Sequence, residues 1–272
     1  MIPSASSTLP EMASHDMNLL PELSIVLPCY NEAEGLADLV GRFAETGTNV
    51  RFELILVDNG STDHTQEVLP DLLQRYEFAR TVRVEQNQGY GHGILTGLKA
   101  ARGTVLAWSH ADLQTDPADV FRAWRLYRQA DRPQRTLVKG RRYGRALKEQ
   151  VISWGMQCAA TVLLRTPLHE INAQPKLFHR DLLEHLEQPP LDLSLDLYVL
   201  YAARRCGWKL QSFPVSFPPR PHGVSSWATT WQSKARTILR SLKYMGRLAI
   251  ARPPRRRPES AALSVVEERS AA

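Results

Sequence analysis

Cysteines and long apolar runs are scarce in this sequence of 272 residues. Its three cysteines, Cys29, Cys158 and Cys206, are widely spaced and form no Cys-x-x-Cys pair, which excludes a disulfide scaffold and argues against a zinc knuckle. No window approaches the roughly 18 consecutive apolar residues of a transmembrane helix, and residues 1–18 lack the apolar core of a secretory signal. We therefore expect a cytoplasmic protein whose cysteines are small buried hydrophobic residues.

Acidic residues are missing from one long region. No Asp or Glu lies between Leu197 and Pro258, whereas thirteen of the 34 Lys and Arg residues do. The whole chain has a net charge of +6, so the rest of it holds more acidic than basic residues. This asymmetry predicts a fixed anionic partner, for which phosphate groups, a lipid surface and nucleic acid are the alternatives.

Short apolar segments alternate with helical patterns along the middle of the chain. β-branched runs predict strands at 23–27, 53–57, 81–84, 104–108 and 136–139. A period near 3.6 predicts helices at about 33–45, 62–77, 91–102, 117–129, 150–165 and 195–206. Apolar strands joined by amphipathic helices are typical of parallel β-α-β units, so we predict an α/β fold with a mostly parallel central sheet and helices on both faces.

The two chain ends differ from this middle region. Residues 1–20 and 251–272 are rich in Ser, Pro or charged residues without periodicity, and we expect disordered tails there. Residues 21–225 contain no linker or repeat and are predicted to form one domain, followed by a helix over 226–250.

Polar motifs follow three of the predicted strands. They are Pro28–Glu32, Asp58–Asp63 and Ser109–Pro117, and ligands of open α/β sheets bind at such strand ends. Local structure offers an alternative for two of them. The segment Asp58–Asp63 fits a turn with a helix cap, and Asp116 fits the N-cap of a helix that begins at Pro117.

Together these motifs resemble family 2 glycosyltransferases of the GT-A fold, over roughly Leu23–Trp227. Members of that family use nucleotide-diphosphate sugars and invert the anomeric centre. The resemblance implies that the nucleotide is bound by residues of the first two strand ends and of the Asn-x-Gly-x-Gly segment. These are Pro28, Tyr30, Asn31, Glu32, Asp58, Asn87, Gly89 and Gly91.

The segment Ser109–Pro117 is similar to the family's Asp-x-Asp metal motif. Asp112 and Gln114 match it, but His110 stands where the family has its first aspartate. The resemblance implies a divalent cation, Mg²⁺ or Mn²⁺, that neutralises the leaving diphosphate. Three alternatives remain for His110: a ligand that favours Mn²⁺, a group that contacts the nucleotide sugar, or a neutral packing residue beside a cation held by Asp112 and Gln114.

Later segments resemble the acceptor side of polyprenyl-phosphate glycosyltransferases. Arg141 and Arg142 match an arginine that faces phosphate there, although a solvated surface is the alternative. Gln174 lies in the place of the family's loop for sugar and acceptor. Asp196 is either a catalytic base, needed for a hydroxyl acceptor, or a core residue paired with an arginine. A phosphate acceptor needs no base, and Arg141, Arg142 and Arg220 then hold the phosphates.

The predicted C-terminal helix is amphipathic. Trp227, Trp231, Ala235, Ile238, Leu242, Met245 and Ala249 share one stripe, and basic residues share the opposite side. Such a helix either packs on the domain or lies in a bilayer interface, and its lack of acidic residues favours an anionic membrane surface.

We therefore expect an inverting glycosyltransferase that moves a sugar from a UDP- or GDP-sugar to an acceptor, polyprenyl phosphate among the candidates. The expected location is peripheral, on the inner face of the plasma membrane, in cell-envelope synthesis. Alternatives are a saccharide or other lipid acceptor in polysaccharide synthesis, and a nucleotide-sugar-binding protein without turnover, suggested by His110 and Asn59. Nucleic acid is not expected as a partner because no recognition motif is present.

Overall fold

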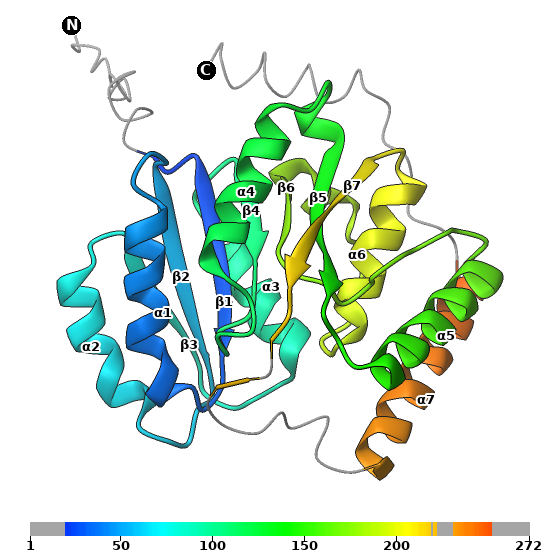
Figure 1. The fold of residues 1–272 in the computed structure, drawn as a ribbon, viewed down its shortest axis with the longest axis horizontal. Helices are drawn as coiled ribbons and strands as arrows, with labels where there is room; N and C mark the ends of the chain where they lie inside the picture. The colour runs from blue at the N-terminus through cyan, green and yellow to red at the C-terminus, as the bar shows by residue number, and fades with distance from the viewer. Residues whose placement is uncertain (1–19, 219, 222–230, 252–272) are drawn as a thin grey trace, which may run out of the picture.

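A seven-stranded sheet forms the centre of the protein in a computed structural model that describes residues 20–218, 220–221 and 231–251 (Figure 1). Its strand order is β3-β2-β1-β4-β6-β5-β7, and only β6 runs antiparallel to its neighbours. The strands are β1 (Leu23–Cys29), β2 (Phe52–Asn59), β3 (Ala79–Val84), β4 (Val105–Trp108), β5 (Thr136–Tyr143), β6 (Lys176–His179) and β7 (Lys209–Ser216). The carboxyl ends of β1, β2 and β4 therefore meet at one edge.

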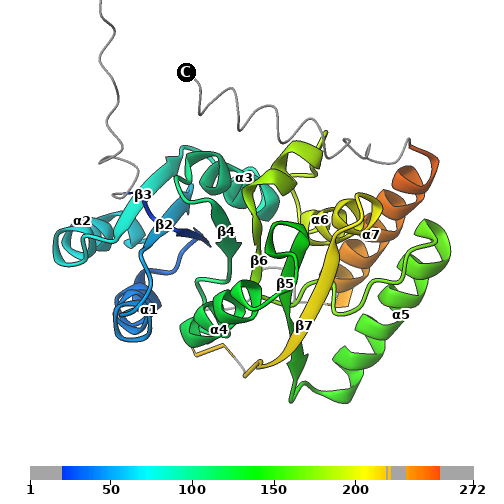
Figure 2. The same ribbon diagram turned by 90° about the horizontal axis from the view of Figure 1, so that it is seen from above.

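Helices cover both faces of this sheet. The described helices are α1 (Ala33–Thr46), α2 (Thr65–Arg75), α3 (Tyr90–Ala100), α4 (Pro117–Arg128), α5 (Leu147–Leu164), α6 (Ser194–Arg205) and α7 (Trp231–Ile250), with short 3-10 turns at Pro133–Arg135 and Arg180–His185. One core layer lies under α1, α2 and α4, and the other lies under α3 and α6 and reaches α5 and α7. Figures 1 and 2 both show α5 and α7 side by side at the end of the molecule far from α2.

The predicted α/β fold is confirmed, and all five predicted strands and six predicted helices are present with shifted ends. Asp116 caps α4 as expected, because its carboxylate accepts a 2.9 Å hydrogen bond from the backbone N–H of Ala118. Strands β6 and β7 were not predicted. β6 has only four residues, beginning with a buried lysine, and β7 is a lightly buried edge strand without an apolar run.

The C-terminal helix packs on the domain through part of its predicted apolar stripe. Met245 is 1% exposed, Leu248 is buried too, and Leu242 packs against the same core, whereas Ala235 and Ala249 are exposed. Trp227 and the predicted start at 226 lie outside the described residues. Within the described ranges, no helix is both long and apolar enough to cross a membrane.

The expectation that all three cysteines are buried is wrong for one of them. Cys29 and Cys206 lie in the core, but Cys158 is exposed on α5. Only Ala160 and Leu164 of α5 are buried, so most of this helix, Cys158 included, is not covered by the core.

Candidate active site

The first two strand ends are joined by hydrogen bonds. The side-chain oxygen of Asn31 accepts from the backbone N–H of Thr62 at 2.9 Å, and the hydroxyl of Thr65 accepts from the N–H of Glu32 at 3.1 Å. Asn31 has a φ of 58°, in the left-handed region that Asn tolerates better than most residues. The two motifs therefore form one folded unit at the sheet edge, and part of their polarity serves this local structure.

One carboxylate oxygen of Asp58 can still accept a hydrogen bond in this unit. One carboxylate oxygen accepts from the N–H of Ser61 at 2.9 Å and makes the predicted turn, while Oδ2 is buried without a partner within the described residues. Buried carboxylate oxygens normally accept hydrogen bonds, so Oδ2 suits a donor from a ligand, such as a ring N–H of a base or a ribose hydroxyl.

The glycine segment lies against another loop. Gly89 has a φ of 110°, and a Cβ there would come within 2.5 Å of the backbone oxygen of Leu191. A Cβ on Gly91 would meet the oxygen of Pro190 at 2.6 Å. Packing against residues 190–192 requires glycine at both positions, and the nucleotide-binding role that the resemblance implies for them stays a prediction. Asn87 is exposed beside them, and its side chain accepts from Asn59 at 3.4 Å.

Arg220 joins the first and fourth strand ends. Its guanidinium pairs with Glu32 and lies 3.5 Å from the carboxylate of Asp112. Burial raises the pKa of Glu32 to about 7, against the opposing effect of Arg220 and with a further rise from nearby Asp112. The carboxylates of Glu32 and Asp112 therefore both lie next to the guanidinium of Arg220. This arrangement shows that the sheet edge can bind a positively charged group.

The residues of the predicted metal motif fit a divalent cation that shares its ligands with a substrate. Asp112 offers a carboxylate, and burial lowers the pKa of His110, which leaves a neutral imidazole able to bind Mn²⁺. Gln114 directs its amide N–H to the oxygen of Pro218 at 3.0 Å. The described residues hold no cluster of three His, Cys, Asp or Glu side chains, so a cation here would take its other ligands from the diphosphate and water.

A buried network lies beneath this motif. Asp196 accepts hydrogen bonds from Lys176 at 2.5 Å and from the amide of Gln174 at 3.0 Å, and that amide also reaches the hydroxyl of Tyr90 at 3.0 Å. Asp196 is 1% exposed and Lys176 is fully buried. Asp196 is therefore paired in the core as one alternative expected, but with a lysine and not with an arginine.

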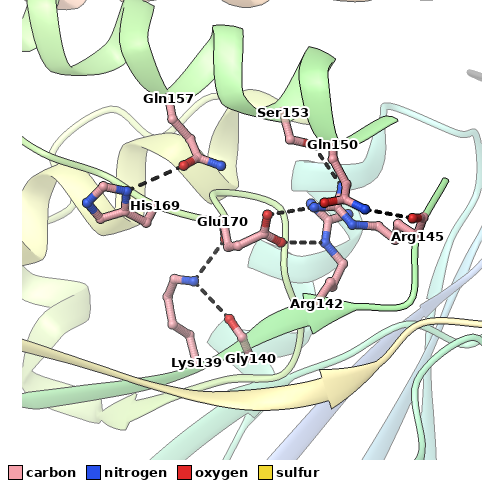
Figure 3. A network of polar contacts seen from close by, with 9 residues as sticks. All are labelled: Lys139, Gly140, Arg142, Arg145, Gln150, Ser153, Gln157, His169 and Glu170. Carbon is pink, nitrogen blue, oxygen red and sulfur yellow. Dashed lines mark hydrogen bonds and ion pairs between the residues drawn. The ribbon is translucent and has the colours of Figure 1, made fainter. Parts of the chain in front are cut away.

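An arginine cluster lies beside this network, where β5 ends (Figure 3). One carboxylate oxygen of Glu170 binds Arg142 at 3.0 Å and the other binds Arg145 at 2.6 Å. The side chain of Arg145 is only 6% exposed, and its Nε has no partner in the described structure. Lys139 is buried below and donates to the backbone oxygens of Gly140 and Glu170 at 2.9 Å. The cluster holds two guanidinium groups against one carboxylate, which suits an anion.

A groove of about 760 Å³ opens over the arginine cluster. Arg141, Arg142 and Arg145 line it from one side, and Trp154 of α5 from another. Phe217 connects the cluster to the metal motif, because its ring lies 5.3 Å from the guanidinium of Arg142 and 6.4 Å from the ring of His110. The groove and the metal motif are thus neighbouring parts of one region.

The structure brings most of the predicted site residues to this region. Tyr30 is 41% exposed at the end of β1 next to half-buried Pro28, and Arg141 is exposed in the groove. The predicted roles of these residues in binding and catalysis remain predictions. The residues that we did not predict are Lys176, Arg145, Glu170 and Phe217. Lys176 could have been suspected as a lysine inside an apolar segment, but Glu170 has no local sequence signal.

Known proteins resemble this chain in sequence. The family model described as "Glycosyl transferase family 2" matches residues 24–185. Dodecaprenyl-phosphate galacturonate synthase of Rhizobium johnstonii is 29% identical over 61% of this chain and 50% of its own length. Dolichol-phosphate mannosyltransferase of Pyrococcus furiosus is 24% identical over 84% of this chain and 63% of its own. The chain thus spans less than two thirds of these relatives.

Solved structures show the same fold at low sequence identity. Glucosyl-3-phosphoglycerate synthase from Mycobacterium tuberculosis, in complex with Mn²⁺, UDP-glucose and phosphoglyceric acid, has a TM-score of 0.64 at 17% identity, over 83% of this chain and 80% of that one. A mannosyltransferase from Pyrobaculum calidifontis, in complex with GDP-mannose and Mn²⁺, has a TM-score of 0.57 at 18% identity, over 93% and 81%. Both are GT-A glycosyltransferases. With a family model that matches more than half of its residues, this chain belongs to the family 2 glycosyltransferases.

Proposed function

We propose that this glycosyltransferase moves a sugar from a UDP- or GDP-sugar to a polyprenyl phosphate at the inner face of the plasma membrane. The arginine cluster supports this acceptor most directly. Arg142 and Arg145 are both bound by the carboxylate of Glu170 and line a groove, and the Nε–H of Arg145 has no partner among the described residues. Forked guanidinium groups held in this way suit a phosphate better than a sugar hydroxyl.

The pairing of Asp196 also supports a phosphate acceptor. A hydroxyl acceptor needs a carboxylate that can take its proton, and Asp196 is buried and bonded to both Lys176 and Gln174. A phosphate monoester is already mostly ionised at neutral pH and needs no base. The role of Asp196 in this proposal is to hold Lys176 and Gln174 in place beneath the site.

In the proposed reaction, an oxygen of the acceptor phosphate bonds to the anomeric carbon from the face opposite the nucleotide. The bond from that carbon to the diphosphate oxygen breaks, and its electron pair leaves with the nucleoside diphosphate. Asp112 and His110 would hold a divalent cation, which supplies charge neutralisation for this leaving group. Arg142 and Arg145 orient the acceptor, while Asp58 and Glu32 bind the nucleoside.

Relatives and structural neighbours supply the remaining support. The two relatives are named for a dodecaprenyl-phosphate and a dolichol-phosphate reaction, and the neighbours were solved with UDP-glucose or GDP-mannose and Mn²⁺. We extend the acceptor class, the sugar donor class and the cation to this chain as parts of the proposal.

Transfer of radiolabelled sugar tests the proposal. The purified chain is incubated with Mn²⁺, undecaprenyl phosphate and labelled UDP-glucose, UDP-galactose or GDP-mannose, and label is counted in the organic phase. We expect organic-phase label with one sugar donor and none when undecaprenol replaces its phosphate. Equal labelling of undecaprenol, or of an added saccharide separated from the aqueous phase by chromatography, would contradict a phosphate acceptor. Nucleotide binding without any transfer would favour the binding-protein alternative.

A further inference from the structure

Helix α5 carries an apolar stripe that the fold leaves uncovered. Leu147, Val151, Trp154 and Val162 are 76%, 58%, 67% and 75% exposed, and exposed Cys158 lies among them. At 100° per residue these five positions fall within an arc of about 80°. No charged residue occurs from Gln150 to Leu164. Contiguous exposed apolar surface of this kind marks a contact with a partner or a membrane.

Helix α7 lies directly beside α5 (Figures 1 and 2). Its exposed side chains include a basic row. Arg236, Arg240, Lys243 and Arg247 are exposed and fall within an arc of about 60°. The helix contains no Asp or Glu, and Asp192 is 3.9 Å from Arg240. The apolar residues Met245 and Leu248 of α7 are used for packing on the domain, so they are not free to enter a membrane.

We propose that an anionic phospholipid bilayer is the partner of this surface, with the stripe of α5 inserted at the interface and the basic row of α7 on the lipid headgroups. An interfacial helix binds through apolar side chains, while each neighbouring cation adds attraction to anionic lipid. A protein partner would need acidic groups opposite α7 and an apolar groove opposite α5. An anionic bilayer provides negatively charged headgroups for α7 and an apolar interior for α5 along the full length of both helices.

This location connects the bilayer to the active site. The groove over the arginine cluster is lined by Val151 and Trp154, which also belong to the stripe. A lipid whose phosphate lies at Arg142 and Arg145 could therefore keep its chain along α5 without leaving the apolar phase. This link rests on the proposed function, whereas vesicle binding does not depend on it.

Cys158 provides a reporter in the natural chain. The other two cysteines are buried, so a thiol-reactive, environment-sensitive dye such as NBD is directed to the centre of the stripe. With vesicles of 70% phosphatidylcholine and 30% phosphatidylglycerol, we expect a blue-shifted emission that rises several-fold. Pure phosphatidylcholine should give a much smaller change. The control is the same dye at Arg75→Cys in a Cys158→Ser background, on the distant helix α2, and its emission should stay unchanged.

Vesicle flotation with matched variants separates the two parts of the surface. Trp154→Ser with Val162→Ser should lower vesicle partitioning by about tenfold or more. Arg236→Gln with Lys243→Gln should lower it by about thirtyfold at low salt. The controls, Leu20→Ser and the charge-matched pair Arg75→Gln with Arg83→Gln, should bind as the natural chain does. Circular dichroism and melting temperature confirm that each variant is folded.

Three results would overturn the inference. They are absence of vesicle binding, vesicle binding without a change in the emission of the dye on Cys158, and a dimer by light scattering that dissociates in Trp154→Ser with Val162→Ser.

Asp112→Asn serves to separate this inference from the proposed function. We expect it to lose sugar transfer and to keep vesicle binding and the dye response. A chain that binds vesicles but transfers no sugar would contradict only the proposed function.

Discussion

Lys176 donates a 2.5 Å hydrogen bond from its ammonium group to the carboxylate of Asp196, and both side chains are buried. Burial lowers the pKa of Lys176, while Asp196 opposes that change. Each charge is thus compensated chiefly by the other. This pairing supports the positioning role that we propose for Asp196, and it allows stability and catalysis to be measured separately.

Removing one partner of this pair should destabilise the fold. We expect Asp196→Asn to lower the free energy of unfolding by about 3–5 kcal/mol because it leaves Lys176 buried without its anion. Replacement of both, Lys176→Met with Asp196→Leu, should recover much of that loss, since buried ion pairs often exchange with apolar residues at little cost. Denaturant titrations of the single and double variants measure both effects.

Sugar transfer by the double variant distinguishes the two roles of Asp196. If Asp196 acts chiefly by compensating the buried charge of Lys176, the folded double variant should retain measurable transfer to undecaprenyl phosphate. A general base contributes about 10²–10⁴-fold, so a loss of that size in a folded double variant would favour the catalytic-base alternative.

Glu170 should matter for the acceptor and not for the sugar donor. Glu170→Gln removes the charge that holds Arg142 and Arg145, so we expect the KM for undecaprenyl phosphate to rise by about tenfold, the value of one charge-assisted bond. The KM for the nucleotide sugar should stay unchanged, and Glu170→Asp should restore part of the acceptor affinity. Glu187→Gln, an exposed charge elsewhere, is the matched control. Equal rises in both KM values would point to a general structural defect.

Lys139 should give the protein a characteristic dependence of stability on pH. Burial, with smaller effects from Lys176 and Arg142, lowers its pKa from 10.5 to about 7. Between these values the unfolded chain binds this proton and the folded protein does not. The free energy of unfolding therefore rises with pH between about 7 and 10.5. Lys139 contributes up to about 1.4 kcal/mol per pH unit to this rise. Below pH 7 the folded protein also binds the proton, and the full cost of burying the charged lysine is present.

Comparison with a neutral variant isolates this contribution. The difference in unfolding free energy between the natural chain and Lys139→Met should grow in favour of the natural chain from pH 7 to pH 10. Lys148→Met, which removes an exposed lysine, should show no such trend. A flat difference for Lys139→Met would show that the lysine is charged in the fold throughout this range.

Local patterns predicted the parts of this protein that depend on local physics. Apolar runs located five strands, and the cap at Asp116 followed from its place before Pro117. Contacts between distant residues could not be read in the same way. Glu170 meets Arg142 and Arg145 only because the chain returns after α5, and Lys176 is buried only because β6 inserts between β4 and β5. The uncovered stripe of α5 was missed because an apolar helix normally predicts burial.

Asp112 should carry the response to divalent cations. A ligand that binds the native state at a hundredfold excess over its dissociation constant adds about 2.7 kcal/mol to stability, so UDP or GDP with Mn²⁺ should raise the melting temperature of the natural chain. Asp112→Asn should lose the Mn²⁺-dependent part of this shift, because a neutral amide is a weak ligand for a hard cation. Asp116→Asn is the matched control four residues away, since Asn caps α4 about as well as Asp. Unchanged shifts in Asp112→Asn would assign the cation to other residues, and differential scanning fluorimetry decides between these results.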